Sequence, residues 1–492
     1  MITPCSGRRR SAAGGVLAWT AAALFLAAAA ALAEDEDRQF QAGAATSNIT
    51  PPLGATLIGG WGSPEAEHIH DELWARCLVL DNGSARLVFV IIDNLGASRE
   101  VFGDARERLA EKTGIPAEHM LMASTHTHSA PSARPSNVLD PPPTLTEYQQ
   151  FIADRIVDGV RRAINNLEPA RIGWGAGDAP GQVFNRRWFM ADGFDLTNPF
   201  GETDQVRMNP PRNHEALADP AGPTDPEIAF LAVESTDGRP MALLANYSLH
   251  YVGGVPGNHV SADYFGVFAR EIGRLLAADG ANPDFVGIMS NGTSGDVNNI
   301  NFRAPAPQRE PYEQINRVAS IAAAEVYKAY QTVEFHDWVA LDARMTELTL
   351  EVRKPSEAIL ERARRILEDP DNAPGLHARE EVYARRAVQM HESPGEVDIP
   401  VQALRVGGVG VAAIPFEVFA ETGLEIKEKS PFEMAFAISF GNGGYGYLPT
   451  PQQHELGGYE TWLGTSRVEI EAAPKITASI LEKFDAMAGD AE

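Results

Sequence analysis

Residues 125–129 carry two histidines one residue apart, directly after the apolar run 120–123. Side chains alternate between the two faces of an extended chain, so His126 and His128 are expected to project from the same side. Two imidazoles placed in this way suit a borderline cation such as zinc, above all beside further histidine or carboxylate groups. The alternative is that both rings bond to the backbone. This segment alone leaves a metal site and a structural histidine pair open.

Other polar side chains stand where further apolar, strand-like runs end. His250 follows the run 241–248, and Asp296 and Asn298 lie in the polar loop after 284–289. Loops of this kind often display functional groups. A lone histidine at a strand end is more often structural, however, so the pattern by itself does not make His250 a metal ligand.

Strand-like and helix-like stretches alternate along the chain, which is typical of the mixed α/β (α+β) class. Strands are expected at 73–80, 87–92, 120–123, 227–233, 241–248, 284–289, 401–405, 409–414 and 434–440, and helices at 99–112, 146–166 and 466–487. Turn-forming residues at 235–238 separate two of the strands. We predict one large body over 34–492, with a mixed β-sheet core flanked by helices and functional residues on strand-end loops.

Two stretches look like insertions into this body. One is the Pro-rich segment 188–226, predicted to be a loop. The other is a charged helical pair at 356–391, broken at 369–371. Either could cover a cleft, although a solvated peripheral elaboration is the commoner role for such segments.

The N-terminus has the features of an export signal. Three arginines at 8–10 precede an uncharged, Ala-rich stretch that runs to Ala33, and acidic residues follow. We predict a signal peptide over 1–33 and a periplasmic or secreted protein with no stable membrane insertion after cleavage. Because the apolar stretch is long, an uncleaved membrane anchor is the alternative.

The chain is strongly acidic, with a formal net charge of −26. Removal of the signal takes away arginines and no acids, so the mature chain would be still more acidic and a poor binder of nucleic acid. Of the two cysteines, Cys5 lies in the signal and Cys77 would remain alone, which excludes an intrachain disulfide. Stability must therefore come from core burial, to which a bound metal could add.

Taken together, these segments resemble the neutral/alkaline ceramidase family, whose members are zinc amidohydrolases that cleave the amide bond of N-acylsphingosines. The resemblance begins at 43–51, continues through 69–76 and has its most distinctive motif at 125–131. It spans most of the chain after the signal. It implies a hydrolase with one zinc ion per chain and a small-molecule or lipid-like acyl substrate.

The resemblance also implies a set of zinc ligands. They are His126, His250, Glu417 and Tyr447. Two histidines, a carboxylate and a phenolate leave room for water, as in catalytic rather than structural zinc sites. Zinc would lower the pKa of that water to about 7, and hydroxide could then attack an amide or ester carbonyl.

Further family positions imply side chains that face the substrate. His128, Arg186 and Tyr459 would stabilise the developing oxyanion or orient the substrate. His259 and Asp263 would support the site through hydrogen bonds. By composition alone, the tyrosines would more often be packing residues.

Two features depart from the family. Where its members carry Gly-Asp-Val-Ser, this chain reads Gly-Asp-Val-Asn over 295–298, so Asn298 replaces the serine. Asp296 is kept and is a candidate catalytic residue, with a turn acid that bonds nearby backbone N–H groups as the alternative. An amide can donate and accept hydrogen bonds but cannot act as a nucleophile. With activated water as the nucleophile, Asn298 could still hold the substrate carbonyl or the leaving group. The chain also stops soon after 466–487, whereas typical members continue into a C-terminal β-sandwich domain.

These departures leave three hypotheses. The first is zinc-dependent hydrolysis of an amide or ester bond, with ceramide specificity left open. The second is a non-catalytic binding protein that kept the metal pocket, and Asn298 favours it. The third is a zinc hydrolase of sugar or cyclitol derivatives, which no motif supports.

Overall fold

Two β-sheets form the centre of the fold. In this computed structural model, residues 1–4, 39–59, 62–276, 284–369 and 375–489 are described. The predicted signal peptide therefore lies almost wholly outside the described residues. Residues 1–39 separate from residues 40–492 as a distinct unit, and the described helices and strands all belong to the second unit.

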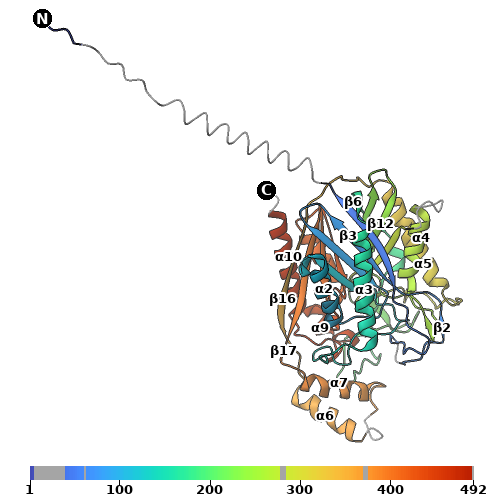
Figure 1. Cartoon of the computed structure of the whole chain (residues 1–492). Coiled ribbons are helices and arrows are strands. Elements are labelled where there is room, and N and C mark those ends of the chain that lie inside the picture. Colours follow the sequence, from blue (N-terminus) through green and yellow to red (C-terminus); the bar gives the residue numbers. More distant parts are fainter. Residues whose placement is uncertain (5–38, 60–61, 277–283, 370–374, 490–492) are drawn as a thin grey trace. The chain divides into compact units, whose positions relative to one another are not determined.

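The larger sheet has eight strands. They are β1 (Gln41–Asn48), β3 (Trp74–Asp81), β4 (Arg86–Ile92), β5 (Met120–Ser124), β6 (Glu168–Asp178), β11 (Glu227–Ser235), β12 (Pro240–Tyr247) and β14 (Val286–Asn291). Their order across the sheet is β14-β12-β11-β6-β1-β3-β4-β5. Figure 1 labels β3, β6 and β12 of this sheet. The pairs β4·β5 and β12·β14 are parallel and the other neighbours are antiparallel. This confirms the predicted mixed α/β class.

A four-stranded sheet packs against the larger one. It consists of β16 (Leu341–Glu351), β17 (Glu396–Val406), β18 (Val409–Ile414) and β20 (Met434–Ser439), in that order. Phe89 and Ile91 on β4 belong to the same buried cluster as Val411 on β18. Because alternate residues of a strand share a face, the inner faces of the two sheets enclose this cluster.

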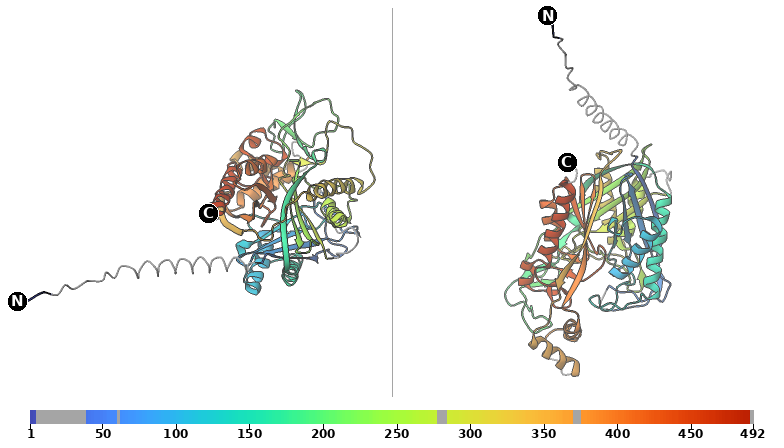
Figure 2. Two further views of the ribbon diagram at one scale, coloured as in Figure 1. Left: turned by 90° about the horizontal axis from the view of Figure 1, so that it is seen from above. Right: turned by 60° about the vertical axis from the view of Figure 1, so that its left-hand side comes forward.

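Helices cover the outer faces of both sheets. They are α2 (Arg99–Thr113), α3 (Glu147–Asn165), α4 (Asp263–Leu276), α5 (Glu313–Tyr330), α8 (Ala420–Lys429) and α10 (Ala472–Gly489). Val88 and Val90 of β4 pack towards α2 and α3, on the face opposite Phe89. The right-hand view of Figure 2 shows α10 on one side of the two sheets and α2 and α3 on the other. The result is four layers with the sheets inside.

The two predicted insertions have regular structure. Segment 356–391 contains α6 (Glu357–Glu368) and nearly all of α7 (Glu380–Glu392), and these two helices pack on each other. Segment 188–226 is not simply a loop, because β8 (Arg187–Met190), β9 (Val206–Met208) and β10 (Leu217–Pro220) form a small antiparallel sheet. Turns between these short strands explain its high Pro and Gly content.

The last helix begins later than the sequence suggests. Residues 466–471 were predicted to be helical, and this part of the prediction is wrong. Val468 forms a bridge with Val352, and Glu469 donates its N–H to the Glu351 carbonyl at 2.8 Å. These backbone bonds extend the edge of β16 and satisfy the groups that a helix would otherwise pair. Tertiary pairing therefore overrides local helix propensity here.

The two edge strands of the larger sheet, β14 and β5, approach each other where they end. Asn291, at the end of β14, donates from Nδ2 to the Thr125 carbonyl just after β5, at 3.2 Å. Asn442, just after β20, donates its N–H to the Met122 carbonyl at 2.6 Å. The loops that follow β5, β14 and β20 consequently gather at one place, and they carry much of the candidate site.

Candidate metal centre

Three histidines converge beside the ends of β5 and β12. His126 and His128 follow β5, and His250 follows β12. One ring nitrogen from each lies within 4.8 Å of the others, so the three could hold a metal ion. The Nε2 atoms of His126 and His128 are 3.0 Å apart. The grouping includes His128, for which the sequence resemblance implied a place facing the substrate.

His126 reaches this position through an unusual backbone conformation. Its φ is +69°, in the left-handed region that a side chain disfavours. The chain is therefore not extended through 125–128, and the alternation that predicted both rings on one side does not apply. The rings meet because the backbone turns at His126. Such strain occurs where the surrounding structure imposes it, often at functional sites.

Backbone carbonyls fix the orientation of all three rings. Nδ1 of His126 lies 2.6 Å from the Leu95 carbonyl oxygen, and Nδ1 of His128 lies 2.6 Å from that of Gly59. Nδ1 of His250 contacts a third carbonyl at 3.1 Å. A carbonyl only accepts, so each Nδ1 carries the proton and a neutral ring leaves the Nε2 lone pair free. This is the tautomer that binds metal, and carbonyl partners of this kind are typical of metal-bound histidines.

Glu417 and Tyr447 come to the histidines on a pair of very short parallel strands. The strands are β19 (Glu417–Val418) and β21 (Tyr447–Leu448), and the two residues are direct register partners. An oxygen of Glu417, Oε2, lies 3.5 Å from Nε2 of His126 and 3.9 Å from Nε2 of His250. The Tyr447 and Glu417 side chains also hydrogen-bond each other. The four ligands implied by the resemblance thus lie in one cluster.

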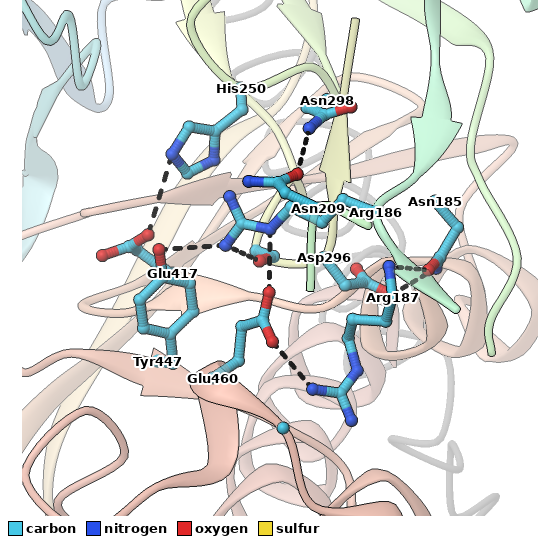
Figure 3. Close-up of polar contacts among 12 residues, drawn as sticks. Asn185, Arg186, Arg187, Asn209, His250, Asp296, Asn298, Glu417, Tyr447 and Glu460 are labelled. Carbon is cyan, nitrogen blue, oxygen red and sulfur yellow. Dashed lines mark hydrogen bonds and ion pairs between the residues drawn. The ribbon is translucent and has the colours of Figure 1, made fainter. Parts of the chain in front are cut away.

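Two atoms at the centre of this cluster have no hydrogen-bond partner among the described residues. They are Nε2 of His250 and Oε2 of Glu417, and both are buried. Figure 3 shows these side chains directed towards each other, with Tyr447 beside them. A buried polar atom without a hydrogen bond costs roughly 1–3 kcal/mol. A cation between them would satisfy both, so the donor set fits a metal.

Burial sets the protonation states that a metal requires. It lowers the pKa of His128 and of His250 well below the usual histidine range, and the neighbouring charges of His126 and, for His250, Arg186 add to this effect. Burial opposes ionisation of Glu417, but His126 and His250 outweigh it and hold the pKa of that carboxyl below its usual range. The cluster therefore offers the neutral imidazoles of His128 and His250 and the carboxylate of Glu417.

Arg186 connects Tyr447 to a buried acid that sequence reasoning missed. Its Nη2 donates to the Tyr447 hydroxyl at 3.0 Å, and its Nε donates to Glu460 at 2.9 Å. The other Glu460 oxygen accepts from Arg187 at 2.8 Å. All these groups are buried. Buried arginines require an acidic partner. The adjacent pair Arg186 and Arg187 was therefore the sequence feature that could have indicated a buried acid such as Glu460.

Asp296 holds the surrounding loops together. Its Oδ1 accepts from the Ala420 N–H at 2.9 Å, and its Oδ2 accepts from Asn185 at 2.8 Å. Its carbonyl accepts from the Arg186 N–H at 2.8 Å. Burial raises the pKa of Asp296 to about 7. Both of its side-chain oxygens therefore bond away from the histidines, and the residue positions the segment that carries Arg186.

Asn298 is almost fully buried and is committed to neighbouring polar groups. Its Nδ2 donates to the side chain of Asn209 at 2.8 Å, and its Oδ1 accepts from the Ile300 N–H at 2.9 Å. Figure 3 shows the Asn298–Asn209 pair beside Arg186. Asn209 lines a cavity of about 290 Å³ together with Tyr459. The hydrogen-bond partner of Asn298 therefore borders this cavity.

The remaining predicted residues occupy different places. The ring of Tyr459 is 5.7 Å from that of Tyr447, centroid to centroid, so it stands next to the cluster. Asp263 accepts the N–H groups of Val252 and Gly253, both at 2.9 Å, and so fixes the loop after His250. His259 instead bonds the hydroxyl of Tyr312 at 2.5 Å, away from the three histidines.

Comparison with known families gives this cluster a context. Residues 40–314 match the family described as neutral/alkaline non-lysosomal ceramidase, N-terminal. The chain belongs to the neutral/alkaline ceramidase family. The matched region contains His126, His128 and His250, whereas Glu417 and Tyr447 lie beyond it.

Curated ceramidases share limited identity with the chain. Neutral ceramidase A of Dictyostelium discoideum is 25% identical over 284 residues, which cover 55% of this chain and 37% of that protein. Neutral ceramidase of Pseudomonas aeruginosa is 24% identical over 314 residues, which cover 61% of this chain and 42% of that protein. These sequence matches thus span less than half the length of either ceramidase.

The fold extends the likeness to most of the chain. The crystal structure of neutral ceramidase from Pseudomonas aeruginosa superposes with a TM-score of 0.67 at 17% identity, over 92% of this chain and 75% of that one. A ceramidase complexed with C2 superposes with a TM-score of 0.68 over 92% of this chain and 76% of that one. The ceramidase fold therefore continues past the matched residues into the part that carries Glu417 and Tyr447.

Proposed function

We propose that the chain is a zinc-dependent hydrolase that cleaves the amide bond of a ceramide-like N-acyl substrate with activated water. One observation carries this proposal. Nε2 of His250 and Oε2 of Glu417 are buried, without a hydrogen-bond partner among the described residues, at the centre of a cluster of metal-binding side chains. Membership of the ceramidase family supports the reaction class.

Zinc is the metal we propose for this cluster. His126, His250, Glu417 and Tyr447 would hold it, because nitrogen and oxygen donors of these types suit zinc. Burial raises the pKa of Tyr447 well above its ordinary value, so a phenolate there needs a cation beside it. When bound, zinc supplies Lewis-acid chemistry and lowers the pKa of a water to about 7.

The chain's own groups would bind and orient the substrate. Arg186 holds the Tyr447 hydroxyl and is itself fixed by Glu460, so its guanidinium is preorganised. Positive charge held in place in a buried site stabilises a developing oxyanion without reorganisation. We assign this role to Arg186, and substrate orientation to His128 and Tyr459. Asn298, through its amide, would hold the substrate carbonyl or the leaving group.

A non-catalytic binding protein is the second candidate. The amide of Asn298 is paired with Asn209 and offers no nucleophile at the position where the sequence resemblance places a serine. If that serine were indispensable, the cluster would bind a metal and a ligand without turnover. Hydrolysis by the purified protein separates the two candidates.

We also propose that the protein is exported, with residues 1–33 as its signal. Among the described residues, no helix is long and apolar enough to cross a membrane. N-terminal sequencing of the mature protein tests this proposal. A start after Ala33 is expected, and an intact Met1 on membrane-bound protein would contradict it.

The function is tested by hydrolysis and metal content together. Purified protein is assayed with a short-chain ceramide, other N-acyl amides and esters, with and without a chelator. We expect about one zinc per chain and release of free fatty acid that the chelator abolishes. His126→Ala should lose both, while His391→Ala, an exposed position on α7, should keep both. Full zinc retention by His126→Ala would overturn the ligand assignment, and zinc without turnover would favour the binding protein.

A further inference from the structure

Two arginines line a cavity beside the proposed metal centre. The cavity has a volume of about 640 Å³, and Arg134 and Arg467 both contribute to its surface. Its other walls are largely apolar and include Pro52, Ile58 and Pro131. The cavity is therefore amphipathic, with an apolar wall and two guanidinium groups.

Neither guanidinium is paired with an acid among the described residues. That of Arg134 has no hydrogen-bond or ion-pair partner there, and Arg467 donates through Nη1 only to the Tyr445 carbonyl, at 3.1 Å. Asp and Glu outnumber Lys and Arg by 67 to 41 in this chain. Two arginines with no acid in direct contact, in so acidic a protein, leave guanidinium N–H groups available to a ligand.

Both arginines remain charged at neutral pH. Burial lowers the pKa of Arg134, and Glu417 and Tyr447 act in the opposite direction. Burial also lowers the pKa of Arg467 to about 10, and the charges of Arg386 and Arg134 contribute. A guanidinium without an acid in direct contact is costly in a partly buried place, so a bound anion would relieve this cost.

Glycines make room for this pair. A Cβ at Gly96 would lie 2.8 Å from Nε of Arg134, and one at Gly446 would lie 2.8 Å from Nη1 of Arg467. Gly446 immediately precedes Tyr447. Both guanidiniums therefore lie directly against backbone, and the position of Arg467 is tied to the loop that carries a proposed metal ligand.

The cavity adjoins the histidine cluster. Ile58 lines it and also lines a second cavity of about 400 Å³, to which His128 contributes. The Ile58 N–H donates to the Ala130 carbonyl at 3.1 Å, which holds this wall next to the histidine segment. A ligand in the arginine-lined cavity would thus lie close to the proposed reaction site.

We infer that Arg134 and Arg467 form a subsite for the anionic oxygen group of an amphipathic ligand, a carboxylate or a phosphate. The apolar part of the ligand would lie along Pro52, Ile58 and Pro131. Guanidinium groups recognise both oxyanions through charge-assisted hydrogen bonds. Anion binding by this subsite does not depend on the proposed function. If the ligand is also a substrate, the inference rests on the proposed function, and the enzyme would prefer anionic acyl substrates to neutral ones.

Calorimetric titration of the full chain after zinc removal tests the subsite independently of turnover. The probes are dodecanoate, dodecyl phosphate and neutral dodecanamide, each below its micelle concentration. We expect at least one anion to bind more tightly than the amide, and Arg134→Gln to weaken its binding about 10- to 100-fold. The preferred anion shows whether carboxylate or phosphate is the natural group.

Two further variants make the result decisive. Arg134→Lys keeps the charge and should lose less affinity than Arg134→Gln. Arg161→Gln, at an exposed position of α3, changes net charge equally and should bind as wild type. Equal anion binding by Arg134→Gln and wild type, or preference of the wild type for dodecanamide, would overturn the inference. Anion binding without any hydrolysis would leave the subsite intact and refute only the proposed function.

Discussion

Glu417 and Tyr447 are direct register partners in a two-stranded parallel sheet, although thirty positions separate them in the chain. Neighbouring residues in register project their side chains in the same direction. The carboxylate and the phenol therefore reach the histidines side by side. Since β19 and β21 are only two residues long, this small sheet acts chiefly to position these two groups.

The first prediction concerns the charge of Glu417. Glu417→Gln keeps the size of the side chain but removes the negative charge beside His126 and His250. We expect zinc affinity to fall about 10- to 100-fold or more, measured by competition with a chromophoric chelator. Glu428→Gln, at an exposed position on α8, is the matched control and should bind zinc as wild type. Unchanged affinity in Glu417→Gln would remove Glu417 from the ligand set.

Metal removal should lower stability. Zinc bound only by the folded state adds about 2.7 kcal/mol to the free energy of unfolding when its concentration is about 100 times Kd. It would also satisfy the unpartnered atoms of His250 and Glu417. We expect a chelator to lower Tm and added zinc to restore it. His126→Ala, which should bind no zinc, is the control, and its Tm should not respond to the chelator. If the Tm of the wild type does not respond either, the protein holds no resident metal.

Asp296 should make stability depend on pH. Burial raises its pKa in the folded protein from 3.8 to about 7. Between these values the folded state binds more protons than the unfolded state, so this residue lowers the free energy of unfolding as pH rises, by up to about 1.4 kcal/mol per unit. Asp296→Asn should remove this slope.

This prediction is checked by urea unfolding of metal-free wild type and variant between about pH 5 and pH 8. The variant loses part of the bonding to Ala420 and Asn185, so it starts less stable at low pH. The difference between the two proteins should shrink as pH rises. A difference that stays constant would show that Asp296 titrates normally.

Glu460 should be essential for the position of Arg186. It bonds both Arg186 and Arg187 in a buried place, and removing one partner of a buried ion pair costs about 3–5 kcal/mol. Glu460→Gln should destabilise the protein by an amount of this order in urea. Because Arg186 acts on the substrate in our proposal, kcat should also fall more than KM rises. Glu455→Gln, at an exposed position, is the control. A change in stability with normal kcat would confine Glu460 to a structural role.

The sequence predicts the strands of the two sheets better than it predicts the geometry of the candidate metal centre. Long runs of β-branched and apolar residues, such as those of β4 and β18, are recognisable because both faces of each strand are buried. By contrast, β19 and β21 are too short for any periodicity, so Glu417 and Tyr447 were accessible only through the family resemblance. The left-handed turn at His126 has no sequence signature either, and it places His128 closer to the ligands than that resemblance implied.

The central claim is that one zinc ion lies among His126, His250, Glu417 and Tyr447. Crystals of the zinc-loaded protein, with diffraction data collected at the zinc absorption edge, test it most directly. We predict one strong anomalous peak within about 2.3 Å of a donor atom from each of these four residues. An empty position there in zinc-loaded crystals, or a peak held by other side chains, would contradict it.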